Sequence, residues 1–406
     1  MKKLSLLIKL LIGIAVGAIF GLVTDSLQKG IIKELLLFII GIFSTFNSIF
    51  GSFLSFMIPL IILSLVSVGL ADLGKKANKL FAVTLLLSYI SSVGAGLVAF
   101  LIGKAFLPIL LQGVTFSSKI DEGNAISPFF TIEMPVIFGV MTALILSFIL
   151  GLGMANIEEK FLLGTLKNLK EIVTLILGKI IIPLIPFHIS GLFMNISAQG
   201  KLASTIRLFA VLYLMIIILQ LLYIIFQFLL STSYTKRNFF QSIKLILPAY
   251  FTALGTQSSA ATIPVSVECA YKAESDKDIV DFAIPLCATI HLAGDTIALT
   301  LGAMGIMMIN GQTVEMSSFL PYIFMLGVIM VAAPGIPGGG VMAALGLLTD
   351  MLSFTAGMQD LMITLHFSQD SFGTATNVSG DQALCQIVNK YSQKSKKILK
   401  ENPIPS

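Results

Sequence analysis

The sequence predicts an all-α integral membrane protein with several spans, and three observations support this prediction. Of the 406 residues, 56% are hydrophobic and only 12% are charged. Apolar runs long enough to cross a bilayer recur from end to end. Polar residues in the last apolar stretch keep a helical spacing, which is typical of a helix facing a protein interior or a wet cavity. A soluble amphipathic helix would show the same spacing, but the rest of the chain is too apolar for that interpretation.

Six uninterrupted spans are expected in the first part of the chain. The first has a basic start and resembles a signal peptide, but only further spans follow it, so we expect it to be retained. The expected ranges are Leu4–Thr24, Leu35–Leu70, Leu80–Leu107, Pro135–Ala155, Leu162–Met194 and Ile206–Leu230.

Basic residues mark alternate loops, which is a topology signal rather than a sign of nucleic-acid binding. By the positive-inside rule, both termini lie on the cytoplasmic side of a cytoplasmic (inner) membrane, and the loop Ser117–Thr131, with Asp121 and Glu122, lies outside. The cytoplasmic groups are Lys2 and Lys3, then Lys75, Lys76 and Lys79, then Lys160, Lys167 and Lys170, then Lys236, Arg237 and Lys244, and finally the tail from Lys390 to Lys400.

Two apolar segments of the second half cannot be continuous helices. Phe251–Ala270 holds small polar residues and a proline, and Val328–Leu348 holds five glycines and two prolines. Proline removes a backbone donor and clustered glycines weaken a helix. In lipid, such backbone survives only where protein buries it or where it lines a cavity. A pair of interrupted segments is a sequence sign of a transporter's binding site; ordinary connecting loops would carry more charge.

Two polar spans alternate with these breaks. Val280–Asn310 carries Thr289, His291 and Gly294–Thr296 at its middle, where we expect local unwinding that turns backbone carbonyls toward an ion. Ile363–Tyr391 carries polar residues four, four, three and four positions apart, which places them on one narrow face at about 100° per residue. They are His366, Asp370, Thr374, Asn377 and Asp381. The order break, span, break, span is consistent with an inverted repeat.

Four motifs occur in a set order: SSAATIP at Ser258–Pro264, ATIHLAGDT, GIPGGG at Gly335–Gly340 and NVSGD at Asn377–Asp381. With this order and spacing the chain resembles the dicarboxylate/amino acid:cation symporter family, which includes the glutamate and aspartate transporters. The resemblance covers essentially the whole chain. It implies eight transmembrane helices and two re-entrant helical hairpins (about Gln241–Ala270 and Phe319–Met351), arranged as inverted repeats in an elevator-type transporter.

The resemblance also implies a homotrimer whose protomers each divide into a scaffold and a moving transport part. The scaffold would comprise residues 1–78 (helices 1–2) and 130–200 (helices 4–5). The transport part would comprise residues 79–110 (helix 3), 201–235 (helix 6) and 240–395 (hairpin 1, helix 7, hairpin 2 and helix 8), with a cytoplasmic tail at 396–406.

Residue roles follow from the matching motif positions, as implications of the resemblance. Asp381, Asn377 and carbonyls near Cys287 and His291 match one Na⁺ site; carbonyls of Thr289, Leu292 and the stretch Met330, Val331 and Ala333 match a second. Asp370 matches the carboxylate that binds the substrate's amino group, and Asn377 and Ser259 match groups that bind its carboxylate. The remaining substrate positions are Thr374, Ser258, Ile336 and Gly340. Oxygen ligands suit a hard cation, and the helix N-termini at the hairpin tips suit an anionic group.

Three departures from the family pattern bear on substrate and coupling. Where acidic-substrate members carry an arginine, this chain has Gly373 in the last span and Gln257 at the first hairpin tip. A substrate side-chain carboxylate would lack its bidentate partner, so aspartate and glutamate are not expected. Asp295 stands where the family's NMDGT signature has threonine, and His291 and Ala293 replace residues of a third Na⁺ site.

The gain of a carboxylate at Asp295 leaves two interpretations open. In the first, Asp295 favours a basic or polar side chain, as in lysine, ornithine, arginine or histidine. In the second, Asp295 binds a cation or is hydrogen-bonded within the protein, and the substrate is neutral, such as serine, threonine or alanine. His291 and His366 also raise the possibility of proton coupling, whereas His188 is expected to pack within the scaffold near Pro183 and Pro186.

Other function classes find less support in the sequence. Cys269, Cys287 and Cys385 are odd in number and lie in apolar segments, so structural disulfides and a cysteine metal site are not expected. HExxH, GxSxG and phosphate-binding loop motifs are absent, which argues against an enzyme or an ATP-driven pump. An ion channel remains a rival, although two broken segments favour an occluding gate.

Overall fold

A computed structural model describes residues 6–74, 79–112, 126–157, 161–273, 275–333 and 335–401. In these ranges the chain is all-helical and contains no strand. Six stretches are long and apolar enough to cross a membrane. The basic residues Lys2, Lys3, Lys75, Lys76 and Lys160 and the acidic pair Asp121 and Glu122, used above to predict topology, lie outside the described residues.

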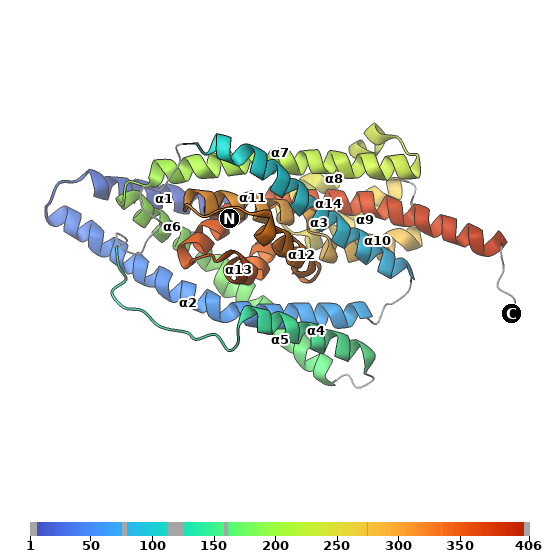
Figure 1. Ribbon diagram of the computed structural model, residues 1–406, viewed down its shortest axis with the longest axis horizontal. Helices are drawn as coiled ribbons and strands as arrows, with labels where there is room; N and C mark the ends of the chain where they lie inside the picture. Colours follow the sequence, from blue (N-terminus) through green and yellow to red (C-terminus); the bar gives the residue numbers. More distant parts are fainter. Residues whose placement is uncertain are drawn as a thin grey trace, which may run out of the picture.

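The helices of the first half of the chain are drawn in blue to yellow-green in Figure 1. They are α1 (Leu6–Ser26), α2 (Ile31–Gly74), α3 (Lys79–Leu110), α4 (Val140–Asn156), α5 (Phe161–Ile176), a π-helical segment (Leu177–Ile181), α6 (Ile182–Ala198) and α7 (Leu202–Thr235). α1 packs along α6, while α2 packs against α4, α5 and α6. Figure 1 shows α2, α4 and α5 on the side away from α7.

Two of the expected spans differ from the observed helices. The span expected at Pro135–Ala155 begins only at Val140, after Gly139 in extended conformation. The span expected at Leu162–Met194 is divided by the π-helical segment, which ends just before Pro183. Proline has no N–H to continue the helical hydrogen bonds, and such an interruption is a common cause of local helix distortion.

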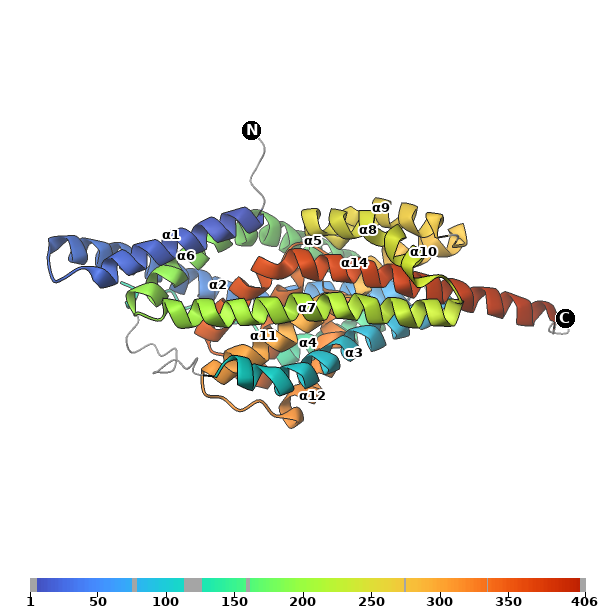
Figure 2. The ribbon, with the colours of Figure 1, turned by 90° about the horizontal axis from the view of Figure 1, so that it is seen from above.

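The second half consists of shorter helices gathered around one long helix. They are α8 (Phe239–Thr256), α9 (Ser259–Lys272), α10 (Lys277–Ile290), α11 (Ala293–Ile309), α12 (Met316–Ala332), α13 (Gly339–Leu352) and α14 (Ala356–Glu401). α14 packs against α7, α8, α10 and α11, and Figure 2 shows it running beside α7. Both predicted interruptions are present: α8 and α9 pack together across Gln257–Ser258, and α12 and α13 pack together across the stretch before Gly339.

The predicted unwinding in Val280–Asn310 is present but lies earlier than expected. The helix stops at His291 and Leu292, and Gly294, Asp295 and Thr296 already belong to the first turn of α11. The side chains of α11 are almost all buried. The break is therefore enclosed by protein, as non-helical backbone at membrane depth must be.

Candidate functional site

The two interrupted helix pairs meet at their breaks. Ser258 caps the N-terminus of α9, where its Oγ accepts from the Ala261 N–H at 3.3 Å, and the same hydroxyl donates to the Gly335 carbonyl at 2.9 Å. Gly335 also faces the Ala288 carbonyl of α10 at close range. The break between α8 and α9 and the break between α12 and α13, nearly 80 residues apart in the sequence, thus lie in contact.

The polar face predicted for α14 is buried and faces these breaks. His366, Asp370, Thr374, Asn377 and Asp381 are all at most 5% exposed. Asp370 Oδ2 accepts from the Gly338 N–H at 2.8 Å, and Asn377 Oδ1 accepts from the Gly294 N–H at 2.7 Å. A single face of α14 therefore contacts both the break before α13 and the start of α11.

Asp295 is hydrogen-bonded within the protein through both carboxylate oxygens. Oδ1 lies 3.0 Å from His366 Nε2, and Oδ2 accepts from Asn377 Nδ2 at 2.6 Å. Gly340 packs directly against Oδ1, leaving no room there for a side chain. This arrangement matches the second interpretation of Asp295, since both oxygens are engaged by neighbouring side chains and a basic substrate would have to compete with His366 and Asn377 for them.

The remaining predicted substrate residues lie at the same junction. Gln257, at the end of α8, donates from Nε2 to Ser371 Oγ at 2.8 Å. Ser259 and Thr374 are buried, Ile336 is half-buried, and Gly373 lies beside the side chains of Gln220 and Gln369. Among residues whose side chains the structure describes, no lysine or arginine is buried. The junction thus has carboxylates and amides, and no fixed cationic side chain within it.

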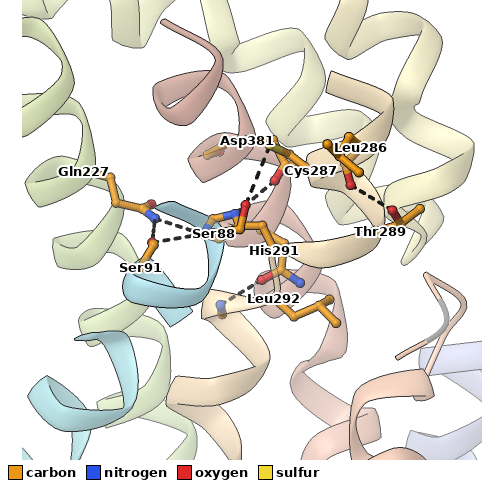
Figure 3. Close-up of polar contacts among 12 residues, drawn as sticks. Ser88, Ser91, Gln227, Leu286, Cys287, Thr289, His291, Leu292 and Asp381 are labelled. Carbon is orange, nitrogen blue, oxygen red and sulfur yellow. Dashed lines mark hydrogen bonds and ion pairs between the residues drawn. The ribbon is translucent and has the colours of Figure 1, made fainter. Parts of the chain in front are cut away.

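The residues predicted for the first ion site come together around Asp381 (Figure 3). Asp381 Oδ1 lies 2.9 Å from His291 Nδ1, and His291 Nε2 lies 3.0 Å from Ser91 Oγ. Cys287 Sγ lies 3.9 Å from Ser88 Oγ. The imidazole of His291 thus bridges α14 and α3 beside the helix break, and it occupies one of the two carboxylate oxygens that the ion interpretation assigns to Na⁺.

The residues predicted for the second ion site are less well arranged for binding. The Leu292 carbonyl already accepts from both the N–H and the hydroxyl of Thr296, at 3.0 and 2.9 Å. The Thr289 side chain is exposed and donates to the Leu286 carbonyl. Met330, Val331 and Ala333 lie at the end of α12, which packs against α10 and α11. To bind Na⁺ here, the Leu292 carbonyl would have to give up one of its hydrogen bonds from Thr296.

Three polar residues of the site were missed from the sequence. Ser91 on α3 and Gln227 on α7 hold the far side of His291, with Gln227 Nε2 donating to Ser91 Oγ at 2.9 Å. Gln220, two turns earlier on α7, donates to the Gly294 carbonyl at 3.0 Å. A glutamine inside an apolar span is itself a sign of a functional polar site. The seven-residue spacing of Gln220 and Gln227 could have placed both on one face of the helix.

Another group of ligand-type atoms comes from the same residues. One atom each of Asp295, His366 and Asp370 lie within 4.8 Å of one another. Around them, His366 Nδ1, Gln220 Oε1 and Gln369 Nε2 are buried without a hydrogen-bond partner. Buried polar atoms rarely stay unpaired, so this junction has the chemistry to take up a polar or charged ligand.

Comparison with known proteins identifies the family of the chain. The family model described as Sodium:dicarboxylate symporter family matches residues 6–391. The chain is 24% identical over 398 residues to a serine/threonine transporter SstT of Bifidobacterium adolescentis, covering 93% of this chain and 87% of that protein. It is 26% identical over 412 residues to SstT of Campylobacter jejuni, covering 96% of each.

A further likeness, over about half of the chain, is to a eukaryotic protein. Excitatory amino acid transporter 1 of Rattus norvegicus is 28% identical over 220 residues, which cover 51% of this chain and 38% of that protein. The family match extends over nearly the whole chain, and the relatives are transporters rather than enzymes. The chain therefore belongs to the sodium:dicarboxylate symporter family of membrane transporters.

Proposed function

We propose that this protein is a Na⁺-coupled symporter of a small neutral amino acid, with serine and threonine as the first candidates. The observation that carries the substrate class is the engagement of both Asp295 oxygens by His366 and Asn377. A basic side chain would have to compete with His366 and Asn377 for Asp295, and an acidic one would find no buried lysine or arginine among the described side chains. The relatives named for serine and threonine support the same class.

The backbone of an amino acid fits the remaining groups. Asp370 is the carboxylate for the ammonium group, and its Oδ2 accepts from the Gly338 N–H. The N-termini of α9 and α13 carry partial positive charge that suits the carboxylate group. Na⁺ would be held by Asp381 and the carbonyls at the helix break, a set of oxygen ligands that suits a hard cation.

Movement of the site across the membrane is the remaining part of the proposal. The helices α8 to α14, with α3 and α7, would form the moving part, and α1, α2 and α4 to α6 the scaffold of a trimer in a cytoplasmic membrane. The two helix pairs would be re-entrant hairpins, giving eight full spans. Support comes from family membership and from the enclosed, interrupted helix pairs.

The test is uptake by purified protein in liposomes under an inward Na⁺ gradient, with K⁺ as control. We expect saturable uptake of serine or threonine and none of lysine or aspartate. Saturable lysine uptake would favour the basic-substrate alternative, and saturable aspartate uptake would contradict both. Uptake driven by a pH gradient without Na⁺ would point to proton coupling, and uncoupled current to a channel.

A matched pair of variants separates the site from general charge effects. Asp370→Asn removes the carboxylate assigned to the ammonium group and is expected to abolish saturable uptake. Asp350→Asn removes an exposed carboxylate of α13 and is expected to leave uptake unchanged. Equal uptake by the two variants would exclude the role given to Asp370.

A further inference from the structure

His188 is not a simple packing residue, contrary to the expectation from the sequence. Its ring is fully buried, and each nitrogen lies against an oxygen of a different helix. Nδ1 lies 3.1 Å from Asn47 Oδ1 of α2, and Nε2 lies 2.9 Å from Asp360 Oδ1 of α14. One side chain of α6 thereby connects α2 to the first turns of α14.

The hydrogen-bond pattern defines which form of the imidazole makes both contacts. Asn47 Nδ2 donates to the His188 backbone carbonyl at 3.1 Å, so its Oδ1 must be the atom that faces the ring. Asn47 Oδ1 and the Asp360 carboxylate are both acceptors, and a neutral imidazole has only one N–H. Only the doubly protonated ring can donate to both.

The surroundings hold this contact in place. Gly191 lets the Asn47 amide approach the α6 backbone, because a side chain there would lie about 3 Å from both amide atoms. The Phe50 ring of α2 lies 5.1 Å from the imidazole. In the described part of the chain, Asp360 is the one ionisable group in contact with the His188 ring, and its side chain is 21% exposed. Protonation of His188 is therefore linked to a single carboxylate, on a helix of the other part of the molecule.

We propose that His188 is a proton-binding residue whose protonated form ties α2 and α6 to α14, so that proton release loosens the contact between the scaffold and the moving part. The proposal rests on the proposed function for the identity of the two parts. Since α14 carries Asp370 and Asp381, any movement of the site relative to α2 and α6 has to break the contact at Asp360. Acidic conditions would slow that step, and alkaline conditions would release it.

The first experiment requires no substrate. The melting temperature of the purified full-length protein is compared with that of His188→Gln at several pH values from about 5.5 to about 8, which brackets the ordinary titration range of histidine. Because the protonated ring makes one more hydrogen bond, the advantage of the wild type is expected to be largest at low pH and to shrink as pH rises. A difference that does not change with pH overturns the proposal.

The second experiment measures transport. At saturating Na⁺ and amino acid, the initial uptake rate of His188→Gln relative to wild type is expected to be about threefold or more higher at acidic pH and to approach one at alkaline pH. Asp360→Asn, which keeps an acceptor oxygen but loses the charge, should show the same trend, while Asp350→Asn should follow the wild type. Substrate affinity should be unchanged in all variants.

The outcomes separate this proposal from the proposed function. A rate ratio independent of pH, with the melting-temperature effect present, would show that the contact does not limit transport and would overturn the inference. If wild type binds and transports no amino acid while the melting effect is present, the proposed function fails instead.

Discussion

Gly380 shows how closely the residues around Asp381 are packed. A side chain on Gly380 would collide with the His291 ring and would lie 2.8 Å from both amide atoms of Gln227. Overpacking of this kind typically costs about 1–3 kcal/mol. We expect Gly380→Ala to lower the melting temperature and to displace His291 together with the helix break whose carbonyls are assigned to Na⁺, so that stabilisation by Na⁺ over K⁺ is lost.

The control for this variant is Gly164→Ala on α5, where nothing lies within 4 Å of the added carbon. Alanine is favoured over glycine inside a helix by roughly 0.5–1 kcal/mol, so this control should be neutral or slightly stabilised. Thermal unfolding in NaCl and in KCl measures both effects. A Na⁺ response of Gly380→Ala equal to that of wild type would contradict the assignment of the carbonyls at the helix break to the ion site.

Individual residues also show how far the sequence alone could lead. The polar face of α14 was predictable, because its members are three or four positions apart and helical geometry relates them. The pairing of His291 with Asp381 and of His366 with Asp295 was not, because the partners are 90 and 71 positions apart. Only the packing of α10, α11 and α14 brings them together, so the sequence could not decide whether Asp295 faces a substrate or the protein.

At the scale of elements, α1 and α6 are held together by a row of glycines. Gly13, Gly17 and Gly21 recur every fourth residue on α1, and a side chain on any of them would meet a backbone carbonyl of α6, at Pro186, Ser190 and Met194 respectively. Close backbone approach through small residues is a typical way for helices to associate in membranes.

If this row of glycines holds α1 against α6, a larger side chain in the row should lower the stability of the protein without changing its affinity for an amino acid. Gly17→Val is expected to separate α1 from α6 and to destabilise the protein by at least about 1–3 kcal/mol, measured as a lower melting temperature. Amino acid affinity of the folded protein should be unchanged, since neither helix contributes to the candidate site. Gly153→Val on α4, with open space around it, is the matched control. Equal melting temperatures for the two variants would show that the row does not hold the helices together.

Some of the helix interruptions could also be predicted from the sequence. The glycine and proline cluster located the break of the second helix pair, because those residues weaken a helix. In the first pair the small polar residues marked the break, whereas Pro264 lies inside α9. The break at His291–Leu292 has no such residue, and the expectation placed it at the nearby Gly294 instead. There the backbone freed by the interruption is satisfied by a tertiary contact, since the Gly294 N–H donates to the Asn377 side chain of α14.

At the scale of the molecule, the membrane-protein class followed from composition and from the recurrence of apolar runs. The division into a scaffold and a moving part remains a prediction, because a single arrangement of helices does not show which of them move together. The contact between α2 and α12 offers a way to test it, since the two helices belong to different parts in the proposal and pack against each other in this structure.

A cross-link between α2 and α12 should stop transport if the two parts move. A Cβ at Gly69 would lie 3.7 Å from Ala332 Cβ, close to the spacing of about 3.8 Å in disulfides. The native cysteines Cys269, Cys287 and Cys385 are buried. We therefore expect the double variant Gly69→Cys/Ala332→Cys to form a disulfide on oxidation, to lose uptake, and to regain it with dithiothreitol, while each single variant stays active. Full uptake by the oxidised, cross-linked protein would contradict relative movement of these helices, because a covalent bond of fixed length would then span a boundary across which the proposal requires displacement.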